Sequence, residues 1–175
     1  MKKSYRITNI AMIAAIYFIV SMAFQFMAFG PIQVRIAEAL IITALLSVDG
    51  IYGLTLGCLI TNTMGVLLMV NGFGAIDIVF GTLFTLFSSI LAYMFRNIRM
   101  FKIKLPIVSL MMPVIINAIG LPIIFSLVLF NEFYLGVYLF DFMTIFIGQF
   151  IACVGLGGLI YHKYSRQLGQ LLNKK

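Results

Sequence analysis

Long apolar runs, separated by short polar breaks, fill this chain from residue 7 to residue 161. Most runs match the length of a membrane-crossing helix, which needs roughly 20 apolar residues to cross a hydrocarbon core of about 30 Å. Charged residues, prolines and glycines mark the breaks between the runs. The pattern predicts six spans, at about residues 7–29, 34–48, 51–70, 75–95, 105–130 and 137–161.

The composition supports a membrane location. Of the 175 residues, 63% are hydrophobic and only 10% are charged, whereas soluble domains carry about 25% charged residues. Irregular backbone cannot face lipid, so the spans must be helices. We therefore expect an all-α integral membrane protein that forms one domain over residues 1–175. The first run, 7–29, is too long for the apolar core of a signal peptide and is expected to be the first span.

Basic residues concentrate on one side of these six predicted spans. If the N-terminus is cytoplasmic, the cytoplasmic segments hold Lys2, Lys3, Arg6, Arg96, Arg99, Lys102, Lys104, Lys163, Arg166, Lys174 and Lys175. The remaining basic residue is Arg35. Because cytoplasmic loops carry the Lys and Arg excess, we expect a multi-pass cell-membrane protein with both termini in the cytoplasm. This orientation, and contact of the basic tail with anionic lipid, explain the net charge of +7 without nucleic-acid binding.

Polar side chains inside a membrane are costly, which makes each of them a candidate for function. The acidic residues predicted in the outer half are Glu38, Asp77, Glu132 and Asp141, and Arg35 stands beside Glu38. Amides at outer-half to middle depth are Gln25, Asn62, Asn117 and Gln149. The inner halves of the spans are nearly free of charge, whereas a channel or proton relay needs polar groups along its whole length. The pattern therefore predicts a polar pocket that opens to the outside.

Each acidic residue also has a plainer explanation. Glu38 could simply pair with Arg35, and Asp77 could cap the helix that it opens, where a carboxylate accepts bonds from free backbone N–H groups. Glu132 could be solvated in a loop, and Asp141 could be an interfacial charge. These alternatives stay open at the level of the sequence.

Two further polar residues are expected to be structural, and one to be functional. Asp49, beside Gly50, is expected in a tight turn, and His162 is expected in solvent at the inner boundary. Asn117 lies between two prolines in the fifth span. Each proline removes a helix hydrogen bond, and broken helices at membrane depth line cavities, so a pocket role is favoured for Asn117.

Small residues four apart recur in three spans and allow helices to approach closely. The pairs are Ala11 and Ala15, Gly53 and Gly57, and Gly148 and Ala152. They are expected either to pack inside the bundle or to form a docking face for another membrane subunit. The two cysteines, Cys58 and Cys153, lack the spacing of a metal site and are expected to act as small apolar side chains.

Motifs for chemistry are absent from the sequence. There is no phosphate-binding G-x-x-x-x-G-K-[ST] loop, no H-E-x-x-H and no G-x-S-x-G. We therefore expect neither an enzyme nor a resident metal or cofactor. Any accumulation of a solute would draw its energy from a partner or an ion gradient.

Four segments together suggest a family. They are Ile-Gln-Val-Arg-Ile-Ala-Glu-Ala-Leu at 32–40, Gly-Cys-Leu-Ile-Thr-Asn at 57–62, Asp-Ile-Val-Phe-Gly-Thr-Leu at 77–83, and Pro-Val-Ile-Ile-Asn at 113–117. In this order they resemble the QueT family, the substrate-binding S components of energy-coupling factor (ECF) transporters for queuosine precursors. The resemblance covers the chain to about residue 120. In that family the last span often carries an acidic residue where this chain has Gln149.

The resemblance implies a six-helix S component that captures a 7-deazaguanine or queuine from outside a bacterial cell. It implies as partners a transmembrane coupling subunit and two cytoplasmic ATPase subunits. It also implies that Ala11 and Ala15 form the face that meets the coupling subunit, and that the S component topples in the membrane during transport.

The chemistry of a 7-deazaguanine suits the candidate residues. Its N1–H and exocyclic amine suit a carboxylate, its carbonyl needs a donor, and an aminomethyl group adds a cation for a second carboxylate. We expect Glu38 and Asp77 as acceptors, Asn62, Asn117 and Gln149 as amide partners, and Arg35 as a gating or orienting residue. The alternatives are an S component for another vitamin, such as riboflavin or a thiamine-like compound, and a structural membrane protein without a ligand.

Overall fold

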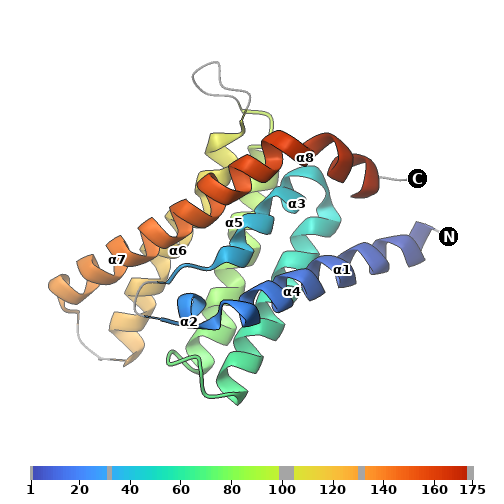
Figure 1. Cartoon of the computed structure of the whole chain (residues 1–175). Coiled ribbons are helices and arrows are strands. Elements are labelled where there is room, and N and C mark those ends of the chain that lie inside the picture. The colour runs from blue at the N-terminus through green and yellow to red at the C-terminus, as the bar shows by residue number, and fades with distance from the viewer. Residues whose placement is uncertain (1, 31–32, 99–104, 130–132, 173–175) are drawn as a thin grey trace.

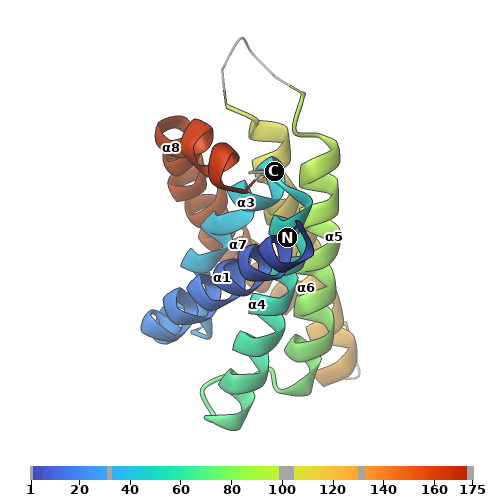
Figure 2. The same ribbon diagram turned by 90° about the vertical axis from the view of Figure 1, so that its right-hand side faces the viewer.

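The computed structural model describes residues 2–30, 33–98, 105–129 and 133–172, and all regular structure in these ranges is helical. The elements are α1 (Lys2–Ala23), α2 (Gln25–Ala28), η1 (Ile36–Leu40), α3 (Ile41–Leu46), α4 (Val48–Leu67), η2 (Asp77–Gly81), α5 (Thr82–Met94), α6 (Ile107–Leu129), α7 (Leu135–Gln149), η3 (Phe150–Leu156) and α8 (Gly157–Leu172) (Figure 1). η1 is a 3₁₀-helix, whereas η2 and η3 are π-helical. Figure 2 shows α1 crossing α4, with α5 and α6 side by side.

Among the described residues, five helical segments are long and apolar enough to cross a membrane, which confirms the all-α membrane class. They are Ser4–Ala23, Val48–Leu67, Asp77–Met94, Ile107–Val128 and Leu135–Leu172. They fall on five of the six predicted spans. Glu132 and the basic residues Arg99, Lys102, Lys104, Lys174 and Lys175 lie outside the described residues.

The predicted span 34–48 is a shorter composite segment. Its helix covers only Ile36–Leu46, in which η1 leads directly into α3. Irregular and 3₁₀ backbone is tolerated at membrane depth only where protein surrounds it. That condition is met, because nearly every residue from Ala37 to Leu45 is buried.

The break after this segment lies at Ser47, and the predicted turn at Asp49 is wrong. Ser47 is extended, with φ −155° and ψ 147°, and its hydroxyl accepts a hydrogen bond from the Asp49 backbone N–H at 3.1 Å. This is the geometry of a helix N-cap. Asp49 therefore stands in the first turn of α4, where the helix dipole favours a carboxylate, and pairs with Arg6 at 2.8 Å.

The last helical segment continues to Leu172, beyond the predicted end of the sixth span at residue 161. Its final turns are amphipathic, so their sequence lacks the continuous apolar run that marks a membrane span. Leu172 nevertheless packs into the hydrophobic core. Two bonds join this end to α1: Tyr5 donates to the Leu171 carbonyl, and Asn9 donates to the Leu172 carbonyl at 3.3 Å. The N- and C-terminal helices therefore meet at one end of the bundle.

Two glycines in α4 allow α1 to pack closely against this helix. A Cβ at Gly53 would lie 2.7 Å from Ile13 Cβ, and a Cβ at Gly57 would lie 2.7 Å from Tyr17 Cβ, so both glycines admit α1. Gly148 in the same way admits the backbone of Gln33. These glycines serve internal packing.

The two alanines of α1 behave differently from the glycines. Ala11 and Ala15 are exposed on the face of α1 that points away from the bundle.

Helix α6 runs without a break through Pro113 and Pro122, so the broken helix expected around Asn117 is not formed.

Candidate functional site

Buried polar side chains gather where α1, η1, α4, η2 and η3 meet. The predicted residues Arg35, Glu38, Asn62, Asp77, Asn117 and Gln149 are all 5% exposed or less. Since buried charges and amides are costly without partners, the contacts of each residue indicate what it can do.

Asp77 is the centre of the first group of contacts. Its Oδ2 forms an ion pair with Arg35 Nη2 at 2.6 Å and accepts a hydrogen bond from Asn71 Nδ2 at 3.0 Å. No side chain caps the N-terminus of η2, so Asp77 serves the ion pair and not a cap. Gly81, one turn on, leaves room for the other carboxylate oxygen, because a Cβ there would collide with Asp77 Oδ1.

Asn62 supports Asp77 through the backbone. Its Nδ2 donates to the Asp77 carbonyl at 2.8 Å, at the first residue of the π-helical segment. A π-helical turn leaves the normal α-helical bonding pattern, and such turns are frequent at functional sites. The Asn62 amide thus holds the turn that presents the Asp77 side chain.

Glu38 is the centre of the second group of contacts. Tyr17 donates to Glu38 Oε1 at 2.8 Å, and Thr85 Oγ1 lies 3.3 Å from the same oxygen. Arg35 does not pair with Glu38, because its ion pair is with Asp77. Within the described ranges Glu38 has no basic partner, although its side chain is fully buried.

A short chain of contacts connects the two groups. Thr85 Oγ1 lies 3.3 Å from Cys58 Sγ, and Asn62 Nδ2 lies 3.4 Å from the same sulfur. On the other side of Glu38, Cys153 Sγ lies 3.6 Å from the Glu38 carbonyl oxygen and 3.5 Å from Gln149 Oε1. Both cysteines are buried free thiols, as expected, and both also contact this polar network.

The contacts thus join five of the six predicted residues and leave Asn117 outside this chain. Asn117 is buried in α6, and its Nδ2 has no partner in the described structure. Asp141 is half-buried and its carboxylate takes no part in the contacts described. His162 is exposed, as expected.

Several buried atoms in this region lack a hydrogen-bond partner. They are Glu38 Oε2, Asp77 Oδ1, Arg35 Nε, Asn117 Nδ2 and both side-chain atoms of Gln33. Native structures leave few such groups, because each unsatisfied buried group costs about 1–3 kcal/mol. The free atoms comprise acceptors and donors, which suits a ligand carrying both.

Sequence reasoning missed several residues of the network. Tyr17, Asn71 and Thr85 look like ordinary helix or turn residues, and Gln33 lies in the break between the predicted spans 7–29 and 34–48. One signal did exist: Asp77, Gly81 and Thr85 are small or polar and recur one helical turn apart, which places them on one helix face. All three are buried in the bundle.

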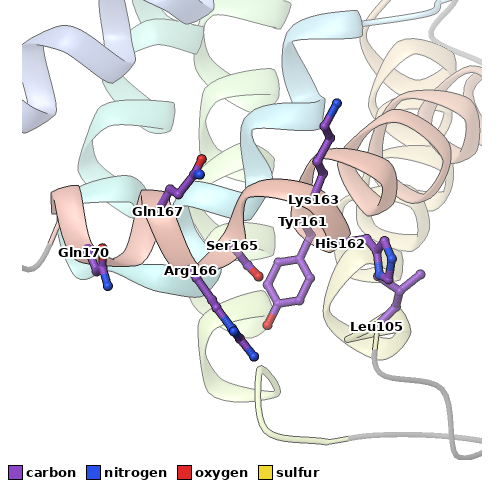
Figure 3. A pocket seen from close by; sticks show the side chains of 8 residues that line it. All are labelled: Leu105, Tyr161, His162, Lys163, Ser165, Arg166, Gln167 and Gln170. Carbon is purple, nitrogen blue, oxygen red and sulfur yellow. The ribbon is translucent and has the colours of Figure 1, made fainter.

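An open cavity of about 570 Å³ lies elsewhere, between α8 and the start of α6. Figure 3 shows Tyr161, Ser165 and Arg166 pointing to one side of α8 and Lys163 to the other. It contains none of the predicted site residues. The buried network, and not this hollow, is the candidate functional site.

Fold and site together define a multi-pass helical membrane protein with a buried network of carboxylate, guanidinium and amide groups. A family model described as QueT transporter matches residues 7–166, which is most of the chain. The chain belongs to this family, which is a family of transporters and not of enzymes.

A curated relative agrees with this assignment. The queuosine precursor transporter QueT of Lactococcus lactis subsp. cremoris (strain MG1363) is 37% identical over 86 residues, which cover 48% of this chain and 47% of the relative. The match thus spans about half the length of that relative. No solved structure matches the chain.

Proposed function

We propose that this chain is the substrate-capture S component of an ECF-type importer, and that it binds a queuosine precursor of the 7-deazaguanine type. The observation that carries this proposal is Glu38. It is a fully buried carboxylate with no basic partner among the described residues and with Oε2 unpartnered. A buried carboxylate of this kind is complemented by a ligand that brings N–H donors.

In this proposal the two carboxylates have different tasks. Glu38 Oε1 is occupied by Tyr17 and Thr85, so Oε2 is the oxygen open to the base edge of the ligand. Asp77 Oδ2 is occupied by Arg35 and Asn71, so Oδ1 is open to a ligand cation such as an aminomethyl group. Arg35 orients Asp77 in this scheme.

The amides also divide between support and contact. Asn62 holds the Asp77 backbone and is a supporting residue. Asn117 Nδ2 is an open donor that suits a ligand carbonyl, and Gln149 borders Glu38 through Cys153. A site of this kind rejects analogues that leave its polar groups unpaired.

The proposed topology has six crossings with both termini cytoplasmic. The second crossing consists of the non-helical residues 33–35, five 3₁₀ residues and six α-helical residues. Its helical part alone rises roughly 19 Å, and residues 33–35 add to that length toward a hydrocarbon thickness of about 30 Å. Six crossings also agree with the contact between α1 and the end of α8. Arg6 and Arg166, near that contact, support the cytoplasmic assignment.

Equilibrium binding by the purified protein in detergent tests the proposed substrate. Because the chain has no tryptophan, equilibrium dialysis with radiolabelled ligand is preferable to intrinsic fluorescence. We expect binding of 7-deazaguanine, 7-aminomethyl-7-deazaguanine or queuine, and no comparable binding of riboflavin or thiamine. Binding of riboflavin alone would contradict the substrate class. Absence of binding to the whole panel would favour a structural protein.

The proposed partners are a transmembrane coupling subunit and two cytoplasmic ATPases, with Ala11 and Ala15 as the docking face. Both alanines are exposed on α1, and small residues let another helix approach closely. The double variant Ala11→Leu/Ala15→Leu should reduce co-purification of the coupling subunit and ATPases from native membranes by about tenfold or more, while ligand binding is unchanged.

The matched control for this variant is Ala75→Leu, which makes the same substitution at an exposed alanine just before η2. It should co-purify the partners at the wild-type level. Undiminished co-purification by the Ala11→Leu/Ala15→Leu protein would place the docking face elsewhere.

A further inference from the structure

Gln33 stands out among the buried polar residues. Its side chain lies on the segment 33–35 that precedes η1, and the residue is 2% exposed. Both Nε2 and Oε1 lack a hydrogen-bond partner, and among the described residues no other side chain has two unpartnered buried polar atoms. A buried amide that satisfies neither its donor nor its acceptor is rare in folded proteins and calls for an explanation.

The backbone holds Gln33 firmly in place. The N–H of the next residue, Val34, donates to the Met27 carbonyl at 3.0 Å. On the other side, the Gln33 carbonyl packs directly against Gly148 of α7, where any Cβ would collide with it. The backbone of this segment is therefore held between α2 and α7.

Gln33 lies two residues before a residue of the proposed site. Residues 33–35 are not helical, and Gln33 and Arg35 are both buried, whereas Val34 between them is half-buried. Both side chains therefore face the protein interior, where Arg35 meets Asp77. Arg35 Nε is also unpartnered, which adds a second open donor there.

Gln33 and Glu38 also border consecutive elements. The Gln33 carbonyl meets Gly148 of α7, and the Glu38 carbonyl lies 3.6 Å from Cys153 Sγ in η3, which follows α7 directly. Both side chains are buried against this stretch and carry unpartnered polar atoms, which makes them candidates to contact one ligand.

We propose that Gln33 is a specificity-determining residue that pairs with the lactam group of the ligand, its adjacent ring N–H and C=O. This inference rests on the proposed function and assigns the part of the ligand that Glu38 does not satisfy. A guanine-type edge presents two donors and one acceptor, whereas Glu38 offers one open oxygen and no donor. Gln33 Nε2 donates to the carbonyl, and Gln33 Oε1 accepts from the ring N–H.

The test compares two ligands on two proteins. The ligands are 7-deazaguanine and 2-amino-7-deazapurine, which keeps the amine but lacks the carbonyl and the adjacent N–H. The wild-type protein should prefer 7-deazaguanine by at least about tenfold, because the analogue leaves the Gln33 amide unpaired. Gln33→Leu should lose most of this preference by binding 7-deazaguanine about tenfold or more weakly.

A second measurement separates recognition from a structural role. Replacing an unpaired buried amide by an apolar side chain of similar size should leave the thermal unfolding temperature of the ligand-free protein unchanged or raised. Gln170→Leu, the same substitution at an exposed glutamine of α8, should change neither affinity nor preference.

The outcomes are distinguishable. If the wild-type protein binds neither compound, that result contradicts both the proposed function and this inference. If it binds 7-deazaguanine but Gln33→Leu keeps the same preference, or weakens both ligands equally, Gln33 does not determine specificity and the proposed function stands.

Discussion

Glu38→Gln is expected to abolish capture of 7-deazaguanine ligands without unfolding the bundle. The amide is nearly isosteric, and its oxygen can keep the bonds from Tyr17 and Thr85. Its nitrogen then takes the place of Oε2 and faces the ligand donors with a donor. The loss of a charge-assisted bond and the clash of donors should weaken binding by at least about 100-fold in equilibrium dialysis.

The matched control for Glu38→Gln is Asp141→Asn. It neutralises another carboxylate in the bundle, one that is half-buried and does not contact the network. Its affinity should stay within about threefold of wild type, since surface-like substitutions have small effects. A Glu38→Gln protein with wild-type affinity would mean that this carboxylate does not contact the ligand.

Asp77→Leu should strongly destabilise the protein even without ligand. The substitution leaves Arg35, which is 5% exposed, as a buried cation without its partner, and it also removes the acceptor of Asn71. Breaking one side of a buried pair costs about 3–5 kcal/mol, so a marked fall in the thermal unfolding temperature in detergent is expected.

The double variant Arg35→Met/Asp77→Leu provides the control for this pair. Replacing both members of a buried ion pair by apolar residues of similar size is often neutral or stabilising, so the double variant should recover most of the lost stability. It should still fail to bind a 7-aminomethyl ligand tightly. Equal stability of Asp77→Leu and wild type would show that the ion pair contributes nothing to the fold.

Much of the fold could be predicted from the sequence because lipid imposes simple rules. An apolar run of about 20 residues signals a helix, and five spans in the described part of the chain follow this rule. The second segment departs from it because its 3₁₀ and extended backbone is stabilised by surrounding helices, which a local pattern does not contain. The end of α8 departs from it because contacts with α1 hold an amphipathic helix in place.

The charged residues of the candidate site could be predicted from the sequence, but their hydrogen-bond and ion-pair partners could not. Glu38 and Asp77 stand out because carboxylates at membrane depth are costly. The partner of Asp77 is 42 residues away in sequence, so the sequence alone offered only the neighbouring Glu38 as an alternative partner for Arg35. Tyr17 and Thr85 are ordinary residues for an apolar helix and become significant only when the fold brings them to Glu38.

The most direct test of the central claim is a structure of the protein bound to 7-aminomethyl-7-deazaguanine. We expect the base edge of this ligand to lie against Glu38 Oε2 and Gln33, and its ammonium group to lie near Asp77 Oδ1. A ligand seated in the open cavity beside Arg166, with the network around Glu38 and Asp77 unchanged, would contradict it.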